Sequence, residues 1–236
     1  MNNVYIMSAN RSAIGGFGGT LKNHCPVDLG TLVAKEAIKR SGFEVNEVEH
    51  AVFGNVIHTE PRDMYVSRVI ALQAGMDKAS AALTVNRLCG SGLQAIVSAS
   101  QILMLGDASV AMAGGVEVMS NGAHIVQGFR WGSRMGDGQV HDMMLGALHD
   151  PFGHGHMGIT AENISSRYQI SREMQDEFAL TSQKRAYEAI ENGAFKDQIL
   201  PIEIKTRKGI DIFEIDEHPK PETSMETLKG LRTAFK

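Results

Sequence analysis

The chain has 236 residues, of which 43% are hydrophobic and 21% are charged, and its formal net charge is -4. This composition excludes an intrinsically disordered chain, and the mixed, mildly acidic charge excludes the basic surface that nucleic-acid or anionic-membrane binding requires. The length is enough for one large domain or two small ones.

Compartment and redox chemistry follow from the same sequence. No uninterrupted apolar run approaches the roughly 18 residues of a membrane span, and the first residues lack the pattern of a signal or transit peptide. The two cysteines, Cys25 and Cys89, lie far apart in different settings, which is not typical of a disulfide-stabilised secreted scaffold. We therefore expect a cytoplasmic protein.

The first half of the chain alternates between strand and helix patterns. Short apolar runs predict four buried strands, at residues 4–7, 51–57, 82–88 and 110–116. Helical spacing predicts helices at residues 26–41, 64–74 and 91–105. The last of these is apolar on nearly all sides, so we expect it to be buried against several neighbours. Such alternation is typical of a mainly parallel sheet covered on both faces, and it predicts a layered α/β domain.

The character of the chain changes after residue 119. A Gly-, Met- and His-rich stretch without a clear period extends to residue 159, which is too long for an ordinary connection and indicates a functional or interface segment. A helix is predicted from Ser171, as its N-cap, to Asn192. A hairpin with Gly209 in its turn is then predicted. We divide the chain into residues 1–119 and 120–236.

The most informative segment is Asn-Arg-Leu-Cys-Gly-Ser-Gly, in which Cys89 falls between a predicted strand and a predicted helix. The unpaired N–H groups and the positive dipole end of a helix favour a thiolate at such a position. Gly90 and Gly92 leave room for a substrate, and free N–H groups could stabilise an oxyanion. The pattern favours a nucleophile for acyl transfer; the alternative is a small buried hydrophobic residue.

Two other patterns point to chemistry less strongly. His141, His149, His154 and His156 lie among acidic residues, but no HExxH or Cys/His ligand spacing accompanies them, so we expect no metal site. The glycines after the first predicted strand do not fit G-x-G-x-x-G, which argues against a dinucleotide-dependent oxidoreductase. Cys25 is interpreted as incidental.

The segment NRLCGSGLQAI resembles the acyl-enzyme cysteine motif of the thiolases. Other segments resemble those of thiolases in the same order over essentially the whole chain, namely RSAIGGFGGTLK, AVFGNVIHTEPRDMY, AMAGGVEVMS, HMGITAEN, SREMQDEFAL and FKDQILPI. GNVIHTEPRDMY and HDMMLGALHDPF are most similar to the biosynthetic β-ketothiolases, the acetyl-CoA acetyltransferase group. The resemblance implies a thiolase-like α/β core with a mainly parallel mixed sheet at residues 1–119, and an α+β loop domain for CoA binding and oligomerisation at residues 120–236.

The resemblance also implies a reaction. Cys89 would accept an acetyl group from one acetyl-CoA, and the α-carbon of a second would attack this acyl-enzyme to give acetoacetyl-CoA and CoA, or the reverse thiolysis would occur. The backbone N–H of Cys89 is expected to help hold the thioester oxygen. CoA thioesters are then substrates, and no cofactor is expected.

Six positions match the residues that contact CoA in thiolases: Leu148, His156, Met157, Lys220, Thr227 and Phe235. The apolar members of this set can line a wall for the pantetheine arm, and His156 can form a hydrogen bond. Lys220 stands where relatives commonly have arginine, and an ammonium group does not make the bidentate phosphate contact of a guanidinium.

The motifs of the second thiolase half, Asn-Glu-Ala-Phe, Gly-His-Pro and Cys-Gly-Gly, do not occur in this sequence. Without a base beside Cys89 and a proton shuttle for the α-carbon, we expect no turnover by this chain alone. We also expect an uncovered sheet edge and uncovered helix faces. A partial gene, a nicked enzyme or a natural half-subunit would each fit, and the lack of a natural end at Lys236 favours the first two.

The expected partners are acetyl-CoA and other acyl-CoA molecules, a homodimer or homotetramer, and possibly a separate chain with the second half, but neither nucleic acid nor membrane. The alternative is a thiolase-like protein that binds acyl-CoA or serves as a scaffold without condensing anything. Acyl chain length and the direction of the reaction are left open by the sequence.

Overall fold

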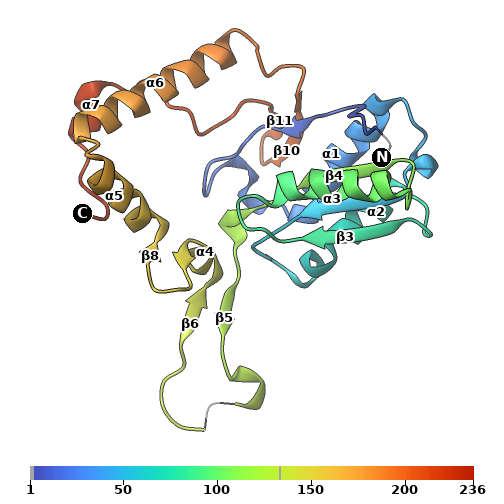
Figure 1. Cartoon of the computed structure of the whole chain (residues 1–236), viewed down its shortest axis with the longest axis horizontal. Coiled ribbons are helices and arrows are strands. Elements are labelled where there is room, and N and C mark those ends of the chain that lie inside the picture. The colour runs from blue at the N-terminus through green and yellow to red at the C-terminus, as the bar shows by residue number, and fades with distance from the viewer. Residues whose placement is uncertain (1–2, 133) are drawn as a thin grey trace.

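A parallel sheet of three strands lies at the centre of the N-terminal part in the computed structural model, which describes residues 3–132 and 134–236 (Figure 1). Strand β2 (His50–Gly54) lies between β3 (Ala81–Val85) and β4 (Ala111–Gly115). Both neighbours run parallel to β2, so the carboxyl ends of all these strands meet at one edge of the sheet. The predicted parallel α/β core is confirmed.

Helices cover both faces of this sheet. Ala51 and Phe53 of β2 face a core shared with α1 (Pro26–Ser41) and α2 (Val66–Ala74). Val52, which points the opposite way because side chains alternate along a strand, packs against α3 (Ser91–Leu105). The bounds predicted for α1 and α3 match the structure, and the other predicted bounds in this part are displaced by a few residues.

Two predictions for this part are wrong. Residues 4–7 do not form a strand, and Ile6 is 78% exposed, so the sheet has three strands rather than four. A run of four apolar residues cannot by itself distinguish a buried strand from an extended segment at the surface. Helix α3 is not buried all round either: Ser91, Ala95 and Ala99 are its buried residues, whereas Leu93 is 69% exposed.

The C-terminal part contains short elements that the sequence pattern did not reveal. They are η4 (Met119–Asn121), β5 (His124–Val126), η5 (Phe129–Trp131), β6 (Val140–Asp142), α4 (Met143–Ala147), β7 (His149–Asp150), β8 (Gly155–His156), α5 (Met157–Tyr168) and α7 (Met225–Lys229). Strands β5 and β6 form an antiparallel hairpin that projects away from the sheet, and α5, α6 (Arg172–Glu191) and α7 form an arm at the other side of the molecule (Figure 1).

The long helix predicted in this part is confirmed as α6 (Arg172–Glu191). The hydroxyl of Ser171 accepts a hydrogen bond from the backbone N–H of Met174, at 3.2 Å, which is the predicted N-cap. Gly193, with φ of 68°, follows the helix in the left-handed conformation that glycine adopts readily.

The predicted hairpin is also confirmed. Strands β10 (Ile202–Thr206) and β11 (Gly209–Phe213) pair antiparallel, and Gly209 has the positive φ, 141°, that the turn requires. This hairpin returns to the N-terminal part of the chain. Ile202 packs with Leu29 and Val118, and Phe213 packs with Ala13.

A short strand near the start of the chain pairs with the residues that directly precede this hairpin. Strand β1 (Arg11–Ser12) pairs in parallel with β9 (Ile199–Leu200), and the Arg11 guanidinium forms an ion pair with Asp216, at 2.8 Å. The remaining single turns are η1 (Thr20–Asn23), η2 (Val45–Glu47) and η3 (Pro61–Tyr65). The division of the chain at residue 119 stays a prediction, and residues 199–216 pack against the part that precedes it.

Candidate active site

Cys89 lies at the carboxyl edge of the sheet, between the end of β3 at Val85 and the start of α3 at Ser91. Its side chain is exposed, so the interpretation of Cys89 as a small buried residue is wrong. No side chain caps α3, and within the described residues the N–H groups of Gly92 and Leu93 make no hydrogen bond. These N–H groups are available to an oxyanion or another negatively charged group at the start of the helix.

The turn that carries Cys89 has an unusual backbone. Leu88 has φ of 46°, in the left-handed region, which costs a non-glycine residue about 1–2 kcal/mol. Such a conformation persists where its surroundings hold it. Here the N–H of Gly90 donates to the carbonyl of Arg87, at 3.1 Å, and the N–H of Ser91 donates to that of Leu88, at 2.9 Å. The result is a tight turn with Cys89 at its outer side.

Glycines allow α3 to begin unusually close to the sheet. A Cβ atom on Gly54, the last residue of β2, would lie 2.7 Å from the Cβ and carbonyl carbon of Ser91. A Cβ on Gly115, the last residue of β4, would lie 3.3 Å from the Cα of Gly92. The helix that follows Cys89 is therefore seated on the carboxyl ends of two strands whose last residues have no side chain.

A carboxylate with several hydrogen bonds organises the loop next to this turn. Glu117 follows β4 and accepts hydrogen bonds from the N–H groups of Ile57, at 2.8 Å, and Val56, at 3.1 Å. It also accepts one from the side-chain amide of Asn55, at 3.0 Å. Burial raises the pKa of Glu117 above its ordinary value. Because the N–H of Asn55 donates to the carbonyl of Val85, at 3.2 Å, this network is joined to the strand that leads to Cys89.

The sequence interpretation missed this network. Its only sequence signal is an acidic residue, Glu117, directly after an apolar strand, and sequence alone does not show which backbone N–H groups its carboxylate will accept from. Asn55 is 1% exposed, which shows that the loop after β2 is part of the interior.

The structure brings four of the six predicted CoA-contact residues together. The N–H of Met157 donates to the carbonyl of Leu148, at 2.8 Å, and the ring of His156 stacks on that of Phe235, with 4.9 Å between centroids. The Nδ1 atom of His156 accepts a hydrogen bond from the N–H of Gly158, at 3.0 Å, and so serves as the N-cap of α5. Because Nδ1 is the acceptor, a neutral His156 carries its proton on Nε2, where it can be donated to a ligand.

Of the other two predicted contacts, Lys220 lies next to α6 and Thr227 lies within α7. The N–H of Lys220 donates to the side-chain carbonyl of Gln183, at 2.8 Å. The hydroxyl of Thr227 is already used in the capping box of α7, where it accepts a hydrogen bond from the N–H of Ser224, at 2.9 Å, and it also donates to the carbonyl of Ser224, at 2.9 Å. Among the described residues, no hydrogen bond, ion pair or ring contact joins Lys220 or Thr227 to the His156 cluster or to Cys89.

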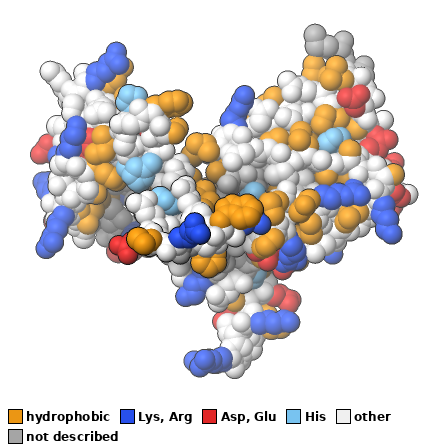
Figure 2. All heavy atoms as spheres, turned by 90° about the horizontal axis from the view of Figure 1, so that it is seen from below, with side chains coloured by type: hydrophobic (Ala, Val, Ile, Leu, Met, Phe, Trp, Pro, Cys, Tyr) orange, Lys and Arg blue, Asp and Glu red, His pale blue; other side chains and the backbone are white. Residues whose placement is uncertain are grey.

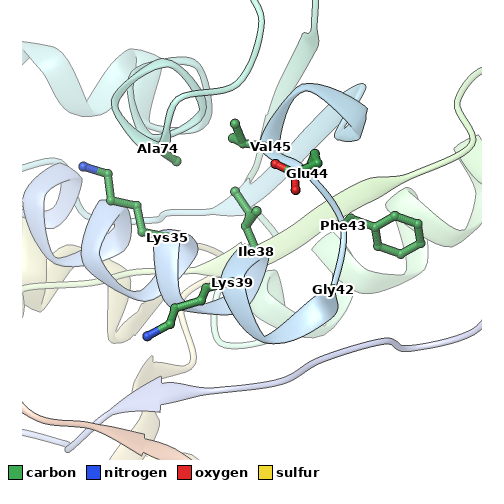
Figure 3. A pocket seen from close by; sticks show the side chains of 8 residues that line it. All are labelled: Lys35, Ile38, Lys39, Gly42, Phe43, Glu44, Val45 and Ala74. Carbon is green, nitrogen blue, oxygen red and sulfur yellow. The ribbon is translucent and has the colours of Figure 1, made fainter.

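The pocket in Figure 3 belongs to another part of the molecule. It has a volume of about 390 Å³ and is lined by Lys35, Ile38, Lys39, Gly42, Phe43, Glu44, Val45 and Ala74, around the end of α1. Residues 42–45 lead into the amino end of β2, whereas Cys89 follows the carboxyl end of β3, so the pocket and Cys89 lie at opposite edges of the parallel sheet.

Within the described parts of the chain, no three His, Cys, Asp or Glu side chains are grouped to hold a metal ion.

Comparison with known proteins relates this geometry to a family. The sequence profile of the family "Thiolase, N-terminal domain" matches residues 4–236. β-Ketothiolase BktB of Cupriavidus necator is 53% identical over 232 residues, a match that covers 98% of this chain and 59% of the relative. Acetyl-CoA acetyltransferase of Escherichia coli is 42% identical over 238 residues, covering 100% and 60%.

Solved structures agree with these matches. The crystal structure of Bacillus anthracis acetyl-CoA acetyltransferase superposes with a TM-score of 0.95 at 44% identity, and the match covers 100% of this chain and 60% of that one. Human mitochondrial 3-ketoacyl-CoA thiolase in complex with CoA has a TM-score of 0.93 at 36% identity, covering 98% and 58%. The chain thus spans about three fifths of the length of the proteins that it matches.

Proposed function

Because this chain belongs to the thiolase N-terminal domain family, we propose that it forms the acyl-accepting part of an acetyl-CoA C-acetyltransferase of the β-ketothiolase type. The Cys89 thiolate attacks the thioester carbon of acetyl-CoA, CoA leaves as its thiol, and an acetyl-cysteine forms. The deprotonated α-carbon of a second acetyl-CoA then attacks this acetyl group, which gives acetoacetyl-CoA and regenerates the thiol. The reverse thiolysis uses the same thiol.

The observation that carries this proposal is the exposed Cys89 at the open start of α3. A thioester carbonyl that reaches Sγ meets N–H groups that have no partner of their own, which can stabilise the developing oxyanion. We assign the removal of the α-carbon proton to a further part of the whole protein, because about two fifths of the relatives' length lies outside the match. On this proposal no cofactor takes part, since the CoA thioesters are substrates.

The cluster around His156 supports CoA binding on the arm. Leu148, Met157 and Phe235 offer an apolar wall for a pantetheine chain, and the Nε2–H of a neutral His156 offers a hydrogen-bond donor. The ammonium of Lys220, nearer α6, is proposed to attract a phosphate group. Thr227 is proposed to help this part of the arm keep its shape through its capping box, with contact to CoA limited to the rim.

Exposed apolar surfaces support an assembly. Near the tip of the β5–β6 hairpin Trp131 is 86% exposed, and Phe129 is also exposed. Hydrophobic side chains also lie at the surface on both the left and the right side of the molecule in Figure 2. Isolated exposed residues are common, but a projecting hairpin with large exposed rings is typical of a contact between subunits. We propose a homodimer or homotetramer that forms in the cytoplasm.

The outer face of α3 supports a second contact. The segment Leu88–Leu105 is apolar and long enough to meet the criterion for a membrane span, a property that it shares with core helices of soluble proteins. Since its other face packs on β2 through Ala95 and Ala99, we propose that protein covers the outer face. That protein is the remainder of a thiolase, in the same polypeptide or in a separate chain.

Mass spectrometry after brief exposure of the whole protein to acetyl-CoA tests the proposal. The expected result is an acetyl adduct on the peptide that contains Cys89, which Cys89→Ser abolishes and Cys25→Ser leaves intact. Full condensation activity in the Cys89→Ser variant would refute the proposal. CoA binding without any acetyl adduct would instead support a non-catalytic acyl-CoA-binding protein.

A further inference from the structure

A buried hydroxyl bridges the two residues that precede Cys89. The side chain of Ser91, which is 5% exposed, accepts a hydrogen bond from the N–H of Arg87, at 2.8 Å, and donates one to the carbonyl of Leu88, at 2.6 Å. We propose that Ser91 is a positioning residue, which holds the turn so that the Cys89 thiol lies against the open end of α3. This inference rests on the proposed acyl transfer to Cys89.

The turn needs such a clamp because its backbone is strained. Leu88 adopts φ of 46°, and its exposed side chain has little packing that would hold it there. The N–H of Leu88 is taken up by the side-chain oxygen of Asn86, at 3.0 Å, which closes the turn from its other side. The strained conformation is therefore maintained by hydrogen bonds, and the Ser91 hydroxyl contributes two of them.

Ser91 is itself fixed on the sheet. It is the first residue of α3, and Gly54 of β2 lies so close that a Cβ there would overlap the backbone and side chain of Ser91. A rigid strand thus holds Ser91, Ser91 holds Arg87 and Leu88, and these residues set the position of Cys89. These contacts connect the sheet core to the turn that carries the reactive sulfur. None of the residues that make them is proposed to touch the substrate.

The expected consequence of the clamp is kinetic. Acetyl-CoA is held mainly by the separate His156 cluster in the proposed function, so loosening the turn should leave substrate binding unchanged. Loosening should instead lower the fraction of time that Sγ spends in position for attack beside the N–H groups of Gly92 and Leu93. Ser91 therefore acts on the acylation rate constant.

The test is single-turnover acetylation in the whole protein that contains this chain. We expect Ser91→Ala to lower the maximum rate constant for Cys89 acetylation roughly tenfold, the factor that corresponds to the net effect of one to two hydrogen bonds. The acetyl-CoA concentration that gives half of the maximum rate should change by less than about twofold. The matched control is Ser100→Ala on the same helix, whose hydroxyl donates to the carbonyl of Ile96 at 2.8 Å, and it should acylate normally.

A second variant separates positioning from a general loss of structure. Asparagine adopts the left-handed conformation more readily than leucine does, so Leu88→Asn should restore most of the lost rate when it is added to Ser91→Ala. A normal maximum rate in Ser91→Ala, a defect confined to the half-saturating concentration, or no recovery with Leu88→Asn would each overturn the inference.

Alkylation of Cys89 distinguishes a failure of this inference from a failure of the proposed function. If the unaltered protein forms no acetyl adduct, the acyl-transfer proposal fails, and the rate of Cys89 alkylation by iodoacetamide then tests the clamp. Ser91→Ala should slow this alkylation severalfold and Leu88→Asn should restore it, whereas equal rates in all variants would overturn the role of Ser91.

Discussion

The close approach of α3 to β2 can be tested with a single methyl group. In Gly54→Ala the new Cβ would lie 2.7 Å from the Cβ and carbonyl carbon of Ser91 and 2.9 Å from its carbonyl oxygen, closer than real Cβ contacts come. Two of these atoms belong to the helix backbone, which cannot rotate away as a flexible side chain does. Overpacking in a core costs about 1–3 kcal/mol, and a clash with backbone should fall at the upper end of this range.

We therefore expect Gly54→Ala to lower the free energy of unfolding by about 3 kcal/mol in a urea titration. The melting temperature should fall by roughly 6–12 °C for a chain of this size. The same shift moves Ser91 and hence Cys89, so the acetylation rate should fall as well.

Gly92→Ala is the matched control for stability, because a Cβ on Gly92 meets nothing within 4 Å. Within the first turn of a helix this change should be neutral or stabilising by up to about 1 kcal/mol. A Gly54→Ala protein whose unfolding free energy lies within about 0.5 kcal/mol of the native value would refute the packing argument.

Three further predictions concern charge and thiol chemistry. Hydrogen bonds from Arg11 lower the pKa of Asp216 below 3.8. The Asp216 carboxylate therefore stabilises the folded state above pH 3.8, and this stabilisation is lost as the pH falls through the folded-state pKa. Asp216→Asn should thus lower the free energy of unfolding by about 1 kcal/mol at neutral pH and much less in acid, as measured by urea titrations at neutral and at acid pH. A difference that is the same at both pH values would contradict this prediction. Burial raises the pKa of Glu117 above 4.5, so the folded state retains this proton more strongly and its stability falls as the pH rises from about 4.5 through the folded-state pKa. Glu117→Gln should remove that part of the pH dependence of stability. An unchanged slope of the unfolding free energy against pH would argue against this prediction. Burial raises the pKa of Cys25 to about 11, so iodoacetamide at pH 8 should label Cys89 well before Cys25 in peptide mass spectra, and equal labelling would exclude this difference.

The sequence predicts an element best where both of its ends carry a local signal. Helix α1 begins at Pro26, a residue suited to the first helical position, and ends before Gly42, which has φ of 80°. Residues 4–7 have no such signals, and whether a short apolar run joins a sheet depends on distant partners. The strand that does form nearby, β1, pairs with β9 from the far end of the chain, which no local pattern indicates.

In the candidate site, too, features with a local sequence signal could be predicted and features that depend on distant partners could not. The position of Cys89 between a strand and a helix could be predicted, because the glycines and the apolar periodicity that determine it lie within a few residues. The hydroxyl of Ser91 and the carboxylate of Glu117 could not, because their roles depend on which backbone groups the fold leaves nearby. The stacking of His156 on Phe235 likewise joins positions that only the resemblance to thiolases had grouped.

The two parts of the proposed site are held in different ways. The turn of Cys89 is anchored on the sheet core, whereas Asp176 is the one buried residue of α6, and α5 and α7 have none among the described residues. Polar contacts shape this arm: Arg172 binds Asp176, at 2.9 Å, and donates to the carbonyl of Leu228, at 2.5 Å. Because such contacts compete with water, they fix geometry less firmly than a packed core does. Phe178 on α6 is exposed, so a covering partner can supply the apolar burial that the arm lacks. Under the proposed function, assembly would then set the distance between the His156 cluster and Cys89, and with it the fit of the proposed CoA thioester.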